Sequence, residues 1–174
     1  QLEKAVSEFL IKSVNGVILD VRNNPGGYLE TAVSVASNWV EAGKTVLIQK
    51  SGDGHEQVYM AEGVNRLGGI STVILINGGS ASASEIVAGA LRDHGLGKLV
   101  GEKSFGKGSV QELIGLPGKA EIKLTIAKWL TPKGNSIHGD GITPDIIVEV
   151  KPEEDKERDP QLEKALEIIF KGRK

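Results

Sequence analysis

The sequence contains no cysteine, which excludes disulfide bonds, thiol nucleophiles and zinc–thiolate sites together. No apolar run approaches the roughly 20 residues of a transmembrane helix, and no secretory signal pattern opens the chain. Aromatic residues make up only 4% of the chain beside 23 glycines, so we expect tight turns around a core of Val, Ile, Leu and Ala. The net charge is only −2 and the basic residues are scattered, which argues against a nucleic-acid partner.

Apolar and amphipathic segments alternate along most of the 174 residues, a length that allows one domain with a buried core. The predicted strands cover residues 17–21, 45–49, 57–60, 70–76, 98–101, 110–114, 122–129 and 146–150. Helices are predicted over residues 2–12 and 29–40, and through 86–91 to a stop near Gly95. This alternation predicts an α/β fold with a largely parallel core. Ile122, Leu124 and Ile126 alternate with polar residues, which indicates a half-buried strand.

The domain organisation is predicted from charge and capping signals near the end of the chain. Residues 151–159 are strongly charged, so we expect a connector between a core of residues 1–150 and an amphipathic helix over 160–174. Asp159 fits a helix cap and Pro160 fits a first helical position. Because Gln1 starts inside a helical pattern, we also expect a fragment or a processed form.

A run of hydroxyl side chains follows the most apolar predicted strand. Ser80, Ser82 and Ser84 fall near a helix start, where unpaired N–H groups and the positive end of the helix dipole collect. Such a setting stabilises an oxyanion and favours a nucleophilic hydroxyl. Ser82 and Glu85 also fit a capping box, so a purely structural role is open, as is anion binding at the turn.

Lys107 lies between Gly106 and Gly108, and Phe105 offers it apolar cover. To act as a base it needs a pKa roughly three units below the usual ~10.4, which burial can provide. The alternative is an ordinary solvated lysine. A hydroxyl nucleophile paired with a neutral lysine would cleave amides without histidine or metal.

Other chemistries are less well supported. Residues 101–107 match the glycine–lysine frame of a phosphate-binding loop, but Gly108 replaces the required Ser or Thr, and a strand rather than a helix is predicted next. His94 cannot form a triad with the adjacent Asp93, although a distant partner such as Asp20 is open. The three histidines lack the spacing of metal ligands, so we predict no metal and no cofactor.

The segment from Asn23 to Gly27 follows a predicted strand and precedes a helix, so its glycine amides can face a cleft. It is equally consistent with a plain turn. Together with the serine turn, it could complete an oxyanion hole of two backbone amides.

Three ordered segments, Gly16–Gly27, Asn77–Leu91 and Gly101–Gln111, resemble the carboxyl-terminal processing peptidases, which are serine endopeptidases of the tail-specific protease type. Segments 139–145 and 159–166 also fit, so the similarity spans residues 14–170. The resemblance implies the following residue roles: a nucleophile at Ser82, a general base at Lys107, an orienting residue for the lysine at Gln111, and oxyanion donors at Ala83 and Gly27, with Gly26 as the alternative to Gly27.

The resemblance also implies a crotonase/ClpP-like α/β spiral, with largely parallel strands and helices and additional antiparallel strands. It further implies a polypeptide substrate cut near its C-terminus through an acyl-enzyme, and a location in the cell envelope or another extracytoplasmic, periplasm-like compartment. The oligomeric state stays open, with a homo-oligomer as one alternative. Family members usually carry a PDZ domain before the protease core, and nothing in this chain resembles one. Two rivals stay open: a non-catalytic peptide- or ligand-binding module, and a crotonase-type acyl-CoA enzyme.

Overall fold

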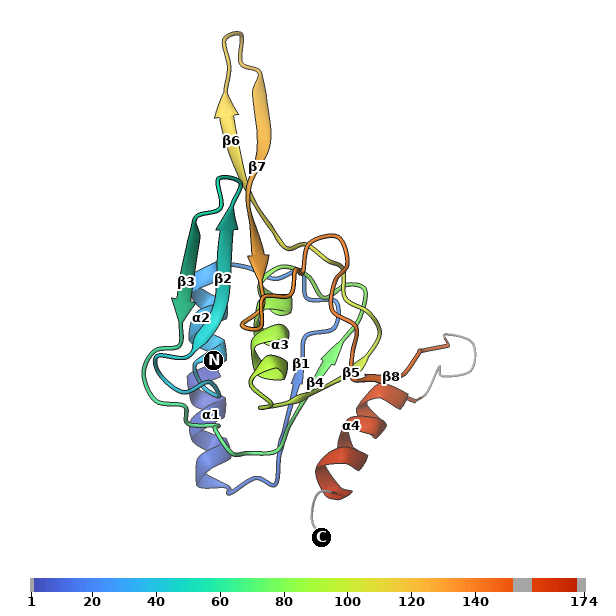
Figure 1. The fold of residues 1–174 in the computed structure, drawn as a ribbon. Coiled ribbons are helices and arrows are strands. Elements are labelled where there is room, and N and C mark those ends of the chain that lie inside the picture. Colours follow the sequence, from blue (N-terminus) through green and yellow to red (C-terminus); the bar gives the residue numbers. More distant parts are fainter. Residues whose placement is uncertain (1, 152–157, 172–174) are drawn as a thin grey trace.

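The computed structural model describes residues 2–151 and 158–171, which form two sheets and the helices around them (Figure 1). The helices are α1 (Leu2–Ile11), α2 (Leu29–Ala36), α3 (Ala83–Asp93) and α4 (Pro160–Lys171). The strands are β1 (Val17–Asp20), β2 (Thr45–Ser51), β3 (Glu56–Met60), β4 (Thr72–Ile76), β5 (Lys98–Gly101), β6 (Ser109–Gly115), β7 (Glu121–Leu130) and β8 (Ile146–Ile147). The fold is therefore α/β, as predicted.

The parallel sheet has the strand order β1-β4-β5-β8 and carries the core. All five residues of β4 are buried, because helices cover both faces of the sheet. Alternate β4 side chains point to opposite faces: Ile74 joins the main core, whereas Val73 and Leu75 pack with Ala165 and Ile169 of α4. The apolar run predicted as a strand is thus the centre of the molecule.

The second sheet is antiparallel, with the order β3-β2-β7-β6, and β6 and β7 extend beyond the body of the protein as a hairpin (Figure 1). The prediction of a half-buried strand over 122–129 was wrong for its outer part. Ile122, Leu124 and Ile126 are 41–45% exposed. The alternation exists, but only the end of β7 from Ala127 to Leu130 pairs with β2, so nothing in the described structure covers the outer apolar face.

Helix α3 joins the two sheets, because it contacts β2 of one sheet and β5 of the other. Its residues from Ala83 to Leu91 are all buried. Helix α2 packs beside it but ends at Ala36, earlier than predicted, and Val40 is buried in the turn that follows. The strand expected over 146–150 is reduced to the two residues of β8.

Helix α4 begins at Pro160, the residue predicted for its first position. The Asp159 carboxylate accepts a hydrogen bond from the Leu162 amide at 2.9 Å, which makes Asp159 the expected cap. Most of the charged connector predicted over 151–159 lies outside the described residues. Helix α4 therefore docks through its cap and its buried face.

Candidate active site

The turn from β4 to α3 holds Ser82 in an unusual backbone conformation. Ser82 has φ 56° and ψ −118°, far from the regions that L-residues ordinarily adopt. Such backbone strain costs about 1–3 kcal/mol and concentrates at functional sites. Ser82 is the residue just before the first turn of α3, and it is 7% exposed.

The neighbouring serines have different surroundings. The fully buried Ser80 hydroxyl donates to the Val21 carbonyl at 2.7 Å and accepts from the Asn77 amide at 3.0 Å. Ser84 already lies within α3 and is 5% exposed. Ser80 is thus fully committed to holding the turn, and Ser82 alone of the three occupies the strained apex.

The glycine turn packs directly against the serine turn. A Cβ atom on Gly26 would lie 2.6 Å from the Ala81 carbonyl oxygen and 2.7 Å from the Ala83 amide nitrogen, and Gly26 has φ +95°. The Ala81 amide donates to the Asn24 carbonyl at 3.0 Å. Only glycine permits this approach, so the two turns form one structural unit at the carboxyl ends of β1 and β4.

The backbone amides of the two turns are used unequally. The Gly26 amide donates to Asn24 Oδ1 at 2.9 Å. The Gly27 and Ala83 amides have no hydrogen-bond acceptor within residues 2–151 and 158–171, and the Cβ position of Gly27 faces open space. Free amides next to a serine are what an oxyanion hole requires, so this geometry favours Gly27 over Gly26 as the partner of Ala83.

The lysine segment is attached to the serine turn through Glu85. Glu85 Oε2 accepts hydrogen bonds from the amides of Ser82 and Lys107, both at 2.9 Å. Glu85 Oε1 accepts from the Ser104 hydroxyl at 2.5 Å and from the Gly106 amide at 2.8 Å. The sequence predicted Glu85 as part of a capping box, and the bond from Ser82 is its half of that box. The bonds to the lysine segment were not foreseen.

The side chain of Lys107 differs from what a neutral base requires. It is exposed, and no hydrogen bond or ion pair joins it to Ser82 or Gln111 in the described parts of the chain. Phe105 is 66% exposed and does not form the apolar cover that the sequence suggested. Gln111 lies on β6 just after an irregularity in the β6–β7 register and is also exposed. The structure thus brings together the backbones of Ser82 and Lys107 but not their side chains.

The predicted strand after Lys107 is confirmed, since β6 begins at Ser109 where a phosphate-binding loop would need a helix. Within residues 2–151 and 158–171, His94 donates to no carboxylate, and its Nε2 lies 2.6 Å from the Thr45 carbonyl oxygen. No group of three His, Asp or Glu side chains suited to a metal ion occurs among residues 2–151 and 158–171.

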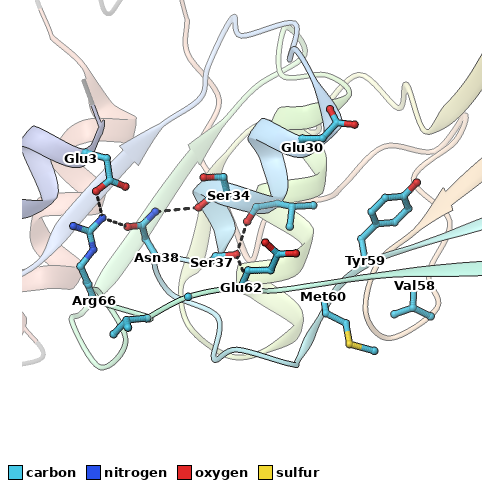
Figure 2. A pocket seen from close by; sticks show the side chains of 13 residues that line it. Glu3, Glu30, Ser34, Ser37, Asn38, Val58, Tyr59, Met60, Glu62 and Arg66 are labelled. Atoms are coloured by element: carbon cyan, nitrogen blue, oxygen red, sulfur yellow. Dashed lines mark hydrogen bonds and ion pairs between the residues drawn. The ribbon is translucent and has the colours of Figure 1, made fainter.

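A pocket of about 810 Å³ lies away from these residues. Its lining includes residues of α2 and β3, and Figure 2 shows Glu30 and Tyr59 toward one end and the Arg66–Glu3 ion pair at the other. A smaller polar pocket of about 480 Å³ is lined by Asn23 and Asn77, at the base of the two turns. Neither is lined by Ser82 or Lys107.

A serine on a strained strand-to-helix turn above a sheet is an arrangement found in hydrolases with α/β folds. The comparison with known families narrows this class. The chain belongs to peptidase family S41, whose sequence model matches residues 1–148. This confirms the resemblance drawn from the three ordered segments.

The chain is similar to the carboxy-terminal-processing protease of Bartonella bacilliformis, with 47% identity over 140 residues that cover 78% of this chain and 31% of that protein. A Staphylococcus haemolyticus protein named as a probable CtpA-like serine protease is 41% identical over 146 residues, covering 83% and 29%. The solved photosystem II D1 C-terminal processing protease superposes with a TM-score of 0.79 at 34% identity, covering 85% of this chain and 38% of that one. The chain thus spans about a third of the length of these relatives.

Proposed function

We propose that this chain is the proteolytic core of a serine endopeptidase in which Ser82 is the nucleophile and Lys107 the general base. The observation that carries the proposal is the strained apex position of Ser82 beside the two free amides of Ala83 and Gly27. Membership of peptidase family S41 supports the same chemistry.

In the proposed reaction, Lys107 Nζ takes the proton of Ser82 as the hydroxyl oxygen attacks the peptide carbonyl. The Ala83 and Gly27 amides donate to the oxyanion that forms. The ammonium returns the proton to the departing amine, which leaves an ester on Ser82. Water, deprotonated by the same amine, then hydrolyses the ester and regenerates the hydroxyl.

The exposed state of Lys107 has to change during this cycle, because a general base must be neutral and burial is what favours the neutral form of an amine. We infer that a bound polypeptide covers the amine, since catalytic hydrogen bonds often tighten only in the substrate complex. Tyr28, which follows Gly27, is 81% exposed, and Phe105, two residues before Lys107, is 66% exposed. These exposed aromatic side chains, each close in sequence to a proposed site residue, provide apolar surface for such a substrate.

The substrate class is proposed from the relatives. One is named as a carboxy-terminal-processing protease and another as a C-terminal processing protease, so we propose cleavage of polypeptides near their C-termini. We also propose an extracytoplasmic site of action, as implied by the family resemblance. Separately, no helix in the described ranges has the length and apolarity to cross a membrane.

The test is cleavage of a quenched fluorogenic polypeptide by the parent chain and by Ser82→Ala and Lys107→Ala variants. We expect each variant to lower kcat by about four orders of magnitude. Lys103→Ala, which removes an exposed lysine from the same segment, is the matched control and should keep the parent rate. Retention of cleavage in Ser82→Ala would assign a different nucleophile, and saturable binding of an acyl-CoA would favour the crotonase-type rival.

A further inference from the structure

We propose that Glu85 is the positioning residue of this active site, because its buried carboxylate fixes the backbone of Lys107 relative to that of Ser82. This inference rests on the proposed function, since it assigns Glu85 a role in aligning the Ser82–Lys107 pair. It goes further by naming a group that never meets the substrate yet sets the geometry of catalysis.

One oxygen atom makes the critical connection. Glu85 Oε2 accepts from the Ser82 amide and from the Lys107 amide, each at 2.9 Å. Because both amide nitrogens are bound to the same oxygen atom, the two backbones cannot move far apart while these hydrogen bonds are intact. The nucleophile lies just before α3 and the base lies in the loop before β6. A backbone hydrogen bond from the Phe105 amide to the Ser80 carbonyl, at 3.0 Å, also joins the two segments, but among the described residues only Glu85 binds the amides of Ser82 and Lys107 themselves.

The other oxygen anchors the rest of the lysine segment. Glu85 Oε1 accepts from the Ser104 hydroxyl and the Gly106 amide, and the Ser104 oxygen in turn accepts from the Ile142 amide at 2.7 Å. An ionised carboxylate has about four acceptor sites, and four donors fill them here. The carboxylate is thereby fixed in orientation.

Helix capping alone does not account for this arrangement. A cap needs only the bond to the Ser82 amide, whereas the other three donors lie 19–22 residues further along the chain. Glu85 is only 1% exposed, and burying a carboxylate is costly unless it is fully hydrogen-bonded. An apolar residue would complete the core of α3 without that cost, so the carboxylate serves the connection to Lys107.

The experiment compares Glu85→Gln with the parent chain on the same fluorogenic polypeptide. Glutamine keeps the volume but places an NH₂ group against N–H donors, so the lysine segment should shift. We expect kcat to fall about 100-fold, as a misplacement of around 1 Å produces, while KM stays unchanged because the buried side chain does not contact substrate. The shape of the kcat–pH profile should also change, which a mere loss of folded protein would not cause.

Two further variants make the test decisive. Glu102→Gln is the matched control, since Glu102 also accepts a backbone amide, that of Val150 at 3.0 Å, but holds no part of the proposed dyad. It should keep the parent kcat. Ser104→Ala removes one donor to Glu85 and should lower kcat roughly tenfold at constant KM, the effect of one charge-assisted hydrogen bond. In a double-mutant cycle, its effect and that of Glu85→Gln should not add.

A Glu85→Gln protein with the parent kcat and pH profile overturns the proposal. If that variant does not fold, a Ser104→Ala protein with the parent kcat overturns it instead. Failure of the underlying function is recognised separately, because Ser82→Ala would then retain cleavage and both proposals would fall together. If Ser82→Ala is inactive and Glu85→Gln is fully active, only the role of Glu85 is lost.

Discussion

Gly26 and Gly27 are neighbours in one turn, yet a side chain would meet different surroundings at the two positions. At Gly26 a Cβ would lie within 2.9 Å of atoms of Ala81, Ser82 and Ala83, in a left-handed conformation. At Gly27 it would meet nothing within 4 Å. We expect Gly26→Ala to lower the free energy of unfolding by about 2 kcal/mol or more, and Gly27→Ala to change it by about 0.5 kcal/mol or less.

Urea denaturation of both variants measures this difference, with Gly27→Ala as the internal control for loss of a glycine. A Cβ atom on Gly26 would also displace the Ala83 amide, which is a proposed oxyanion donor. The kcat of Gly26→Ala should therefore fall as well. Equal stability of the two variants would contradict the close packing of the glycine and serine turns.

For single residues, the sequence predicted the role of a side chain better than its structural surroundings. Ser82 could be assigned from the resemblance, but its strained backbone and the commitment of Ser80 depend on contacts with the Asn24 and Val21 carbonyls from a distant turn. Glu85 was visible only as a cap, because its other partners follow it by many residues. The exposure of Lys107 likewise depends on long-range packing, which local sequence does not specify.

Among the elements, α4 is held to the parallel sheet by an ionic contact as well as by its apolar face. Arg22 donates to both carboxylate oxygens of Asp159, at 2.8 and 2.7 Å, and Gln161 donates to the Val148 carbonyl. The hydrogen bonds from Arg22 lower the pKa of Asp159 below its usual 3.8. A lowered pKa in the folded state means that the stabilisation is present above about pH 4 and is lost as the pH falls through the folded-state value.

We therefore expect Asp159→Asn, which can still cap α4, to reduce stability at pH 7 by about 1 kcal/mol, since the pair is partly exposed. The difference from the parent should shrink below pH 3.8, where Asp159 becomes protonated in the unfolded chain and then in the folded chain. Thermal denaturation across this pH range measures it, with the exposed Glu41→Gln as a charge-matched control. A difference that persists unchanged at the lowest pH would exclude the ionic contact as its cause.

The β6–β7 hairpin shows that a correctly predicted strand with an apolar face need not be buried. Leu124 is 45% exposed on the hairpin, whereas Leu75 of β4 is fully buried, although both lie in correctly predicted strands. We expect Leu124→Thr to change the free energy of unfolding by about 0.5 kcal/mol or less and Leu75→Ala to lower it by about 2–5 kcal/mol. Urea titrations of the two variants measure this contrast, and a large loss in Leu124→Thr would mean that the hairpin face is covered in solution.

For the whole molecule, the order of elements was predictable, but their assembly into two sheets was only partly so. Helix α2 lies between β1 and β4 in the chain and helix α3 between β4 and β5, and that alternation identified the α/β class. The partners of β7 could not be deduced, because it pairs with β6 through a short turn but also with β2, whose residues lie far earlier in the chain. Such long-range pairing is fixed by packing around α3 rather than by local pattern.

The two tryptophans of the chain report on the two sheets separately. Trp39 is buried and donates its Nε1–H to Thr72 Oγ1 of β4 at 2.9 Å, whereas Trp129 belongs to β7. Both pack in the core cluster that also contains the buried residues of α3, so neither sheet has a hydrophobic core of its own on that side. We therefore expect the sheets to unfold as one cooperative unit.

The measurement uses the single-tryptophan variants Trp39→Phe and Trp129→Phe. Within each variant, the urea midpoint from tryptophan fluorescence should equal the midpoint from far-ultraviolet circular dichroism, because one core serves both sheets. Trp39→Phe should itself be less stable by about 1 kcal/mol, since it loses the bond to Thr72. A fluorescence transition of Trp129 that precedes the circular dichroism transition would show that the antiparallel sheet opens first, and α3 would then not join the two sheets energetically.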